Sequence, residues 1–197
     1  MIGFSCTSLS PLPVREVLDM AVGRFELWEI FAEQEHSLVD NRAVFSDLLP
    51  SYDLSYSVHT PISDINIASI NERVRIASLN EVESCARIAS ELGITVVTVH
   101  PGLEPLAVKG RTEAAIAQAK RSIRHLDSVA EEYGLEMGIE NMPLMPYFLG
   151  RTAETLADLV DGTDLGVTFD IGHAFTMGEV DAMIDTFKDR MVNIHIH

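Results

Sequence analysis

The sequence predicts an α/β fold in which short strands alternate with helices. Seven segments have the apolar, β-branched and aromatic content of buried strands, and helical stretches with one apolar stripe separate them. The six strand–helix units between Cys6 and His195 average about 31 residues. A (β/α)8 barrel has this spacing, and so does a doubly wound open sheet, so the spacing alone leaves both architectures open.

Strands are expected where apolar runs end at a turn signal or a polar side chain. Several of these runs are apolar nearly throughout, as is typical of strands that are covered on both faces. The expected strands are Ile2–Cys6, Phe25–Phe31, Leu54–His59, Thr95–His100, Leu135–Glu140, Gly166–Asp170 and Met191–His195.

Helices are expected between these strands. In Asn71–Leu92 and Thr112–Tyr133, apolar residues recur every three or four positions, which gives each helix one face suited to packing on a sheet. Gly93 and Gly134 follow these stretches, and a glycine adopts the left-handed C-cap conformation without strain. Shorter helices are expected at Pro13–Val22, Val39–Leu48, Thr152–Val160 and Glu179–Phe187.

The composition narrows the class of protein. Asp and Glu number 30 against 14 Lys and Arg, a net charge of −16, so the surface repels phosphate backbones and disfavours non-specific nucleic-acid binding. The two cysteines, Cys6 and Cys85, are expected to be core thiols in a reducing compartment. Without a membrane-spanning run or a secretion signal, we expect a cytoplasmic protein with one domain over residues 1–197.

Histidines and carboxylates gather at the expected strand ends. Parallel strands of a barrel share one face at their carboxyl ends, so these side chains would converge there. Imidazoles with carboxylates suit zinc, manganese or similar divalent ions. One histidine at a strand end is more often structural, but five lie at or just past these ends and are hard to explain as packing: His59, His100, His173, His195 and His197. The expected metal ligands are His59, His100, Glu140, Asp170, His173 and His195. His36 and His125 lie outside the pattern and are expected to be solvated.

Five segments at these strand ends carry a resemblance to a known group of proteins. In order they are SVHTP, TVHPG, GIENMP, TFDIGHAF and NIHIH, and they resemble the xylose isomerase-like TIM barrels, which include sugar isomerases, sugar epimerases and endonuclease IV. The resemblance favours the barrel over the open sheet. It implies an α/β (β/α)8 TIM barrel that is incomplete at its C-terminal end, with seven strands and six helices and the last βα unit missing.

The resemblance also implies roles for single residues. His59 and His100 match two histidines that hold a zinc ion in the endonuclease IV-like members, and Glu140 matches a carboxylate that bridges metals there and is catalytic in the epimerases. Asp170 matches a metal-ligating aspartate. The remaining matches are His173, a catalytic residue that binds substrate or metal, and His195, a metal ligand. An eighth-strand glutamate and an Asp-x-His segment of the family have no counterpart here.

Three further residues are expected to contact substrate. Glu29 lies at the end of the second strand, where it would be a substrate contact, an acid behind the metal ligands, or a member of a surface or core salt bridge. Asn141 adjoins Glu140, and it would orient that carboxylate or contact the substrate. His197 shares a strand face with His195. Lys109, Arg111 and Arg151 follow the fourth and fifth strands and would suit a phosphate on a sugar, or be plain surface charges.

The resemblance implies either a sugar isomerase or epimerase or an endonuclease, and the net charge of −16 favours the first. The leading hypothesis is a metal-dependent isomerase or epimerase that acts on a small sugar or sugar phosphate by proton transfer next to a carbonyl. The cofactor would be a divalent metal, zinc or manganese, and the partner would be a small carbohydrate. A homo-oligomer is also expected, because the enzymes that the chain resembles are commonly dimers or tetramers. The first alternative is a zinc-dependent phosphodiesterase of the endonuclease IV type that acts on abasic DNA. The second is a non-catalytic relative that binds a metal or metabolite.

Overall fold

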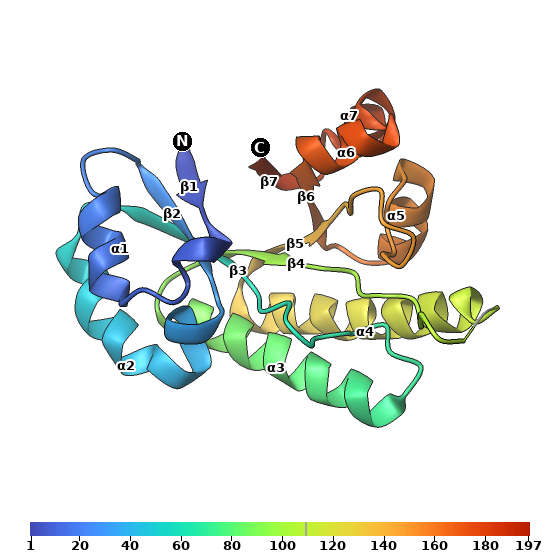
Figure 1. Cartoon of the computed structure of the whole chain (residues 1–197), viewed down its shortest axis with the longest axis horizontal. Coiled ribbons are helices and arrows are strands. Elements are labelled where there is room, and N and C mark those ends of the chain that lie inside the picture. The colour runs from blue at the N-terminus through green and yellow to red at the C-terminus, as the bar shows by residue number, and fades with distance from the viewer. Residues whose placement is uncertain (109) are drawn as a thin grey trace.

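The structure is a computed structural model that describes residues 1–108 and 110–197. Within these residues, seven strands form one parallel sheet in chain order, and the sheet curls into part of a barrel with helices outside it (Figure 1). A doubly wound sheet would reverse its strand order, so the observed order confirms the predicted TIM-barrel architecture. The strands are β1 Gly3–Ser5, β2 Leu27–Phe31, β3 Ser55–His59, β4 Val96–Val99, β5 Glu136–Glu140, β6 Gly166–Asp170 and β7 Met191–His195.

The helices follow the strands as the apolar spacing predicted, with one addition. The α-helices are α1 Val14–Ala21, α2 Leu38–Leu48, α3 Glu72–Glu91, α4 Thr112–Tyr133, α5 Ala153–Val160, α6 Ile171–Met177 and α7 Val180–Phe187, and short 3-10 helices lie at Thr7–Leu9, Gln34–His36 and Leu49–Ser51. One helix was expected between β6 and β7, but the described residues hold two. The first, α6, is capped at its start by the Asp170 side chain and is followed by Gly178, its C-cap residue in the left-handed conformation.

The two long helices end as predicted. Gly134 is the left-handed C-cap of α4, with a φ of 65°. Gly93 has a φ of 78° and directly follows Leu92, the C-cap residue of α3. Helices α3 and α4 run side by side across the outside of the sheet (Figure 1). Each helix therefore packs its apolar face against the middle strands and returns the chain to the end of the sheet where the next strand begins.

Side chains of the strands divide between two faces. Alternate strand positions point away from the barrel axis, and over the five middle strands this outer face is apolar and buried against the helices. Outer-face residues of the five middle strands are Ile30, Val58, Val97, Ile139 and Val167. The positions between them point inward and are mostly polar. This polar inner face leads directly to the strand ends where the predicted site lies.

Two histidine predictions and one cysteine prediction can be compared with the structure. His36 is not solvated: it is buried against the edge of Trp28, with its Nε2 3.1 Å from the Leu12 carbonyl. His125 is partly exposed and pairs with Glu83. Cys85 lies in the core, but Cys6 is only half-buried.

Over residues 1–108 and 110–197, none of the helices has the length and hydropathy to cross a membrane.

Candidate active site and metal centre

The carboxyl ends of the strands bring the predicted residues together. His59, Glu140, Asp170 and His195 are the last residues of β3, β5, β6 and β7, and His100 directly follows β4. They line one cavity of about 510 Å³. The same cavity is lined by His173, His197 and Glu29. All the predicted site residues except Asn141 therefore share one space at the end of the barrel where active sites form.

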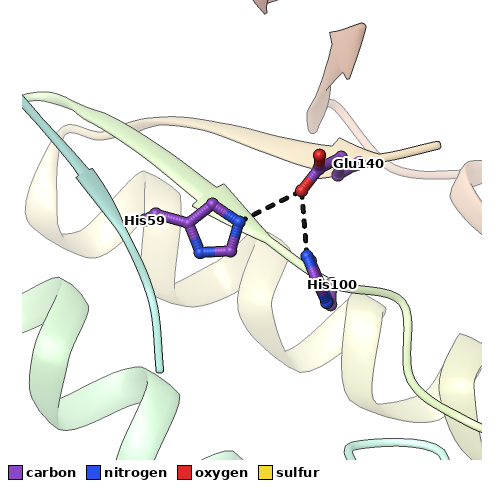
Figure 2. A group of neighbouring side chains, drawn as sticks. All are labelled: His59, His100 and Glu140. Carbon is purple, nitrogen blue, oxygen red and sulfur yellow. Dashed lines mark hydrogen bonds and ion pairs between the residues drawn. The ribbon is translucent and has the colours of Figure 1, made fainter. Parts of the chain in front are cut away.

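Glu140 is the centre of the cluster. Its Oε2 lies 3.1 Å from His59 Nε2 and 3.0 Å from His100 Nε2, and Figure 2 shows both imidazoles pointing at this oxygen. Its Oε1 lies 3.2 Å from His195 Nδ1 and 3.6 Å from His173 Nδ1. The carboxylate is only 2% exposed, so these imidazoles stand where water would otherwise solvate the charge.

The two carboxylate oxygens of Asp170 have different partners: one caps helix α6, and the other faces the histidines of the site. Oδ1 accepts a hydrogen bond of 2.6 Å from the backbone N–H of His173 and thereby caps α6. Oδ2 lies 2.9 Å from His197 Nε2 and 3.8 Å from His195 Nδ1. The cap places His173 beside the site, where its Nδ1 lies 2.9 Å from the carbonyl oxygen of Asn141. The ring of His197 packs edge-on against that of His173, with centroids 5.2 Å apart.

Asn141 does not face the cavity. Its amide donates to the backbone carbonyl of Asp170 at 2.9 Å and accepts from the Asp170 N–H at 2.7 Å, and the side chain is fully buried. Asn141 therefore ties the end of β5 to the end of β6. That Asn141 also orients the Glu140 carboxylate or contacts substrate stays a prediction.

The ionisation of the cluster follows from its close pairing. Burial works to raise the pKa of Glu140, but hydrogen bonds from His100, His195 and His59 outweigh it and hold the pKa well below its usual range. Burial works to lower the pKa of His195, but hydrogen bonds to Glu140 and Glu29 raise it to about 10. The pKa of His59 is raised in the same way by Glu140, whereas burial leaves the pKa of His100 lowered. The cluster therefore pairs ionised carboxylates with a protonated His195 near neutral pH.

The donor atoms fall into three overlapping groups that could each hold a metal ion. The groups are His59, His100 and Glu140; Glu140, Asp170 and His195; and Asp170, His173 and His197. In each group the donor atoms lie within 4.8 Å of one another. Two buried carboxylates with surrounding imidazoles match the ligand chemistry of zinc and manganese. Glu140 and Asp170 each belong to two groups, so each carboxylate could join neighbouring centres.

A layer of polar side chains lies beneath the cluster, and three of its members, Thr98, Thr168 and Asn193, were not predicted from the sequence. Asn193 Nδ2 donates to Glu29 Oε2 at 2.6 Å and to Thr98 Oγ1 at 3.3 Å, and Thr98 Oγ1 lies 2.9 Å from Thr168 Oγ1. These residues precede the strand-end residues by two positions. Side chains two apart on a strand share a face, so the alternation N-x-H in the last strand was a signal for Asn193.

The basic residues considered for a sugar phosphate lie elsewhere. Arg151 lines a separate hollow between α4 and α5, and Arg111 precedes α4 as its N-cap residue. Neither residue lines the cavity of the cluster. Lys109 lies outside the described residues. Within the described residues, the prediction of a phosphate contact therefore has no support from Arg111 or Arg151.

Comparison with known proteins places the chain in a family. A family model described as the xylose isomerase-like TIM barrel matches residues 19–197. The chain belongs to this family. An uncharacterized protein of Methanocaldococcus jannaschii is 35% identical to it over 202 residues, which cover 98% of this chain and 69% of that protein.

Two further relatives of this xylose isomerase-like chain have names that refer to enzymes. The crystal structure of a D-tagatose 3-epimerase-like protein matches it with a TM-score of 0.90 at 32% identity, over 99% of this chain and 75% of that one. A protein of Mycobacterium leprae named "Probable endonuclease 4" is 27% identical over 182 residues, which cover 91% of this chain and 68% of that protein. The chain thus spans about two thirds to three quarters of the length of these relatives.

Proposed function

We propose that the protein is a metal-dependent isomerase or epimerase that acts on a small sugar by moving a proton next to a carbonyl group. The observation that carries the proposal is the buried Glu140 carboxylate, set among imidazoles at the strand ends and opening on a cavity of about 510 Å³. A cavity of this size suits a small-molecule substrate. The likeness at 32% identity to a D-tagatose 3-epimerase-like protein supports the same class.

The metal would be held by the group that shares both carboxylates, Glu140, Asp170 and His195. A divalent metal bound there would polarise a substrate carbonyl and so make the neighbouring C–H more acidic. Asp170 is suited to this position because the α6 cap engages one of its oxygens and leaves the other turned to His195 and His197. His59 and His100 approach Glu140 from its other oxygen, where they would support it or complete a second centre.

Glu140 is the group that would take the proton. The Glu140 carboxylate is ionised at neutral pH, as a general base must be, and its low pKa makes it a weak base that would depend on the metal to acidify the neighbouring C–H. His173 is a candidate to hold a substrate hydroxyl, because its ring is partly exposed at the cavity and its Nδ1 is engaged by the Asn141 carbonyl at 2.9 Å, which leaves Nε2 as the nitrogen available for a hydroxyl. His197 would add a contact at the cavity rim, where its side chain is 61% exposed.

The charge of the chain also supports a small substrate. At −16, the chain repels polyanions, whereas a neutral sugar meets no such barrier. Among the residues that the structure describes, no lysine or arginine lines the cavity. An unphosphorylated sugar is therefore favoured over a sugar phosphate.

A second candidate, a metal-dependent phosphodiesterase, is favoured by one observation. Glu140 belongs to two donor groups, one through each oxygen, which is how a carboxylate joins neighbouring metal ions in two-metal hydrolases. The relative named "Probable endonuclease 4" supports this reading. An abasic-DNA substrate would require the −16 chain to bind a polyanion, so this candidate ranks second.

Proton exchange with solvent tests the first candidate without knowledge of the exact sugar. The protein is loaded in turn with Mn²⁺, Co²⁺, Zn²⁺ and Mg²⁺ and incubated in D2O with a panel of ketopentoses, ketohexoses and 3-keto sugars. We expect deuterium to enter the carbon next to the carbonyl of at least one sugar, as measured by mass spectrometry and NMR.

The matched control is Glu140→Gln, which keeps the shape of the side chain and removes the base. It should abolish the exchange. A parallel assay offers an abasic-site oligonucleotide to the same metal-loaded samples. Cleavage of the oligonucleotide with no exchange in any sugar would replace the first candidate with the second.

A further inference from the structure

Glu29 is a buried carboxylate that the proposed chemistry does not use. It lies on the inner face of β2, it is 3% exposed, and it belongs to none of the three donor groups found among the described residues. An ionised carboxylate is expensive to bury unless other groups pair with it. The identity of its partners therefore indicates what it does.

The partners of Glu29 come mainly from the opposite side of the curled sheet. Asn193 Nδ2 donates to its Oε2 at 2.6 Å, and His195 Nε2 lies 3.1 Å from Oε2 and 3.0 Å from Oε1. Both partners belong to β7, whereas Glu29 belongs to β2, and the two strands are not neighbours in the sheet. Ser57 on the adjacent β3 approaches at 3.5 Å. Glu29 thus reaches across the barrel interior to the last strand.

His195 is held between two carboxylates that lie on opposite sides of its ring. Nε2 faces Glu29, and Nδ1 faces Glu140 Oε1 at 3.2 Å with Asp170 Oδ2 at 3.8 Å. An imidazole that ligates a metal through one nitrogen carries its proton on the other, and a carboxylate on that proton fixes the ring and makes it a better ligand. The geometry around His195 matches this arrangement, with Nδ1 on the side of the proposed metal.

We propose that Glu29 is a positioning residue that holds His195 in the Nε2–H form, so that Nδ1 is directed at the metal between Glu140 and Asp170. Asn193 supports it by fixing the Glu29 carboxylate from the same strand as His195. The inference rests on the proposed metal centre, and it adds a specific carboxylate–histidine–metal chain to it. Glu29 acts through His195 and does not contact the metal.

Four variants separate this role from a merely structural one. Glu29→Gln keeps the size and one acceptor but removes the charge, and Glu29→Leu removes both. Ser122→Ala is the control, because it deletes buried hydrogen bonds to the Ile67 carbonyl and Arg75 that have no link to Glu29, Asn193 or His195. His195→Ala reports the loss of the ligand itself. Thermal unfolding of each metal-free variant identifies the fraction that is folded.

The readouts are Co²⁺ affinity, measured in competition with a chelator, and the visible absorption band of the bound Co²⁺. We expect Glu29→Leu to weaken Co²⁺ binding about 10- to 100-fold and to alter the band, with Glu29→Gln between it and the wild type. Ser122→Ala should match the wild type within about twofold in affinity and should keep the same band, because Ser122 lies outside this network. In the Zn²⁺-loaded wild type, ¹⁵N NMR should show His195 protonated at Nε2.

Two results would overturn the inference, and they differ in what they say about the metal centre. If His195→Ala weakens Co²⁺ binding but Glu29→Gln and Glu29→Leu leave affinity and band unchanged, the positioning role is wrong and the metal centre stands. If the wild type itself binds neither Co²⁺ nor Zn²⁺, the proposed metal centre fails and this inference fails with it.

Discussion

The two faces of the same sheet differ sharply in what they contribute. The outer face carries Ile30, Val58, Val97, Ile139 and Val167, all fully buried against helices. The inner face carries the polar residues Glu29, Ser57, Thr98, Thr168 and Asn193, with the histidines and carboxylates of the site above them. Barrel interiors are commonly filled with branched apolar residues. Here the apolar residues that stabilise the fold lie on the face that packs against the helices, and the interior holds hydrogen-bonded polar residues and candidate metal ligands.

Ile139 and Glu140 show the division within one strand. They are consecutive residues of β5 and both are buried, yet Ile139 packs in the apolar core and Glu140 accepts contacts from imidazoles of three other strands or their ends. The alternation of a strand separates them completely. If the comparison is right, substitutions at these neighbours should have effects of different kinds.

The largest effect is expected from Glu140→Gln. Removing the proposed base should lower the rate of deuterium exchange into the substrate by about 10²- to 10⁴-fold. The free energy of unfolding should change much less than the activity, because Gln fills the same space. Steady-state exchange rates and chemical denaturation of the two proteins check this. An active Glu140→Gln enzyme would remove Glu140 from the role of base.

Ile139→Ala should produce the reverse pattern. Deleting a fully buried side chain from the core should lower the free energy of unfolding by about 2–5 kcal/mol. The Co²⁺ affinity of the fraction that remains folded should stay close to that of the wild type, because the deleted atoms face the helices. Urea denaturation and Co²⁺ titration test both halves. A large loss of affinity in folded protein would contradict the separation of the two faces.

The response to pH should also come from the inner face. The pKa of His195 is raised to about 10, so its proton must leave before Nδ1 can bind a metal. Metal affinity should therefore rise with pH between about 7 and 10, by up to about tenfold per unit, and then level off. The contribution of His195 to the stability of the metal-free protein has the opposite sign: it is complete below pH 6.5 and is lost as the pH rises through about 10.

Chelator competition at several pH values checks the affinity, and thermal unfolding of the metal-free protein checks the stability. The control is His195→Ala, in which both slopes attributed to this group should become smaller. An affinity that is independent of pH in the wild type would mean that His195 does not have to release a proton on binding the metal.

The smallest effect is expected on the solvent side of the helices. Arg87 and Glu91 pair at 2.6 Å one turn apart on α3, and both side chains are substantially exposed. Arg87→Ala should change the free energy of unfolding by about 0.5 kcal/mol or less, because solvent screens an exposed pair. Metal affinity should not change. A loss comparable to that of Ile139→Ala would show that stability is not concentrated in the apolar layer.

The sequence determined the order of elements and the end of the sheet where the site lies. Buried parallel strands must be apolar on their outer face, and they end where polar residues begin, so the positions of His59, His100 and Glu140 were readable from local pattern. Helix ends at Gly134 and Gly93 were equally local, since glycine adopts the left-handed conformation without a steric penalty. The motifs at the strand ends also identified the family that the comparisons confirm.

Only the tertiary structure decided what each polar side chain faces. Asn141 and Glu140 are adjacent, but the side chain of Asn141 is hydrogen-bonded to the backbone of Asp170 at the end of β6. His36 was expected at the surface, but in the structure it packs against Trp28. Glu29 and His195 lie 166 residues apart and meet because the sheet curls until β2 and β7 share an interior. Local pattern fixes the face of a strand on which a side chain lies, whereas its partners depend on the curvature of the whole sheet, which no single segment encodes.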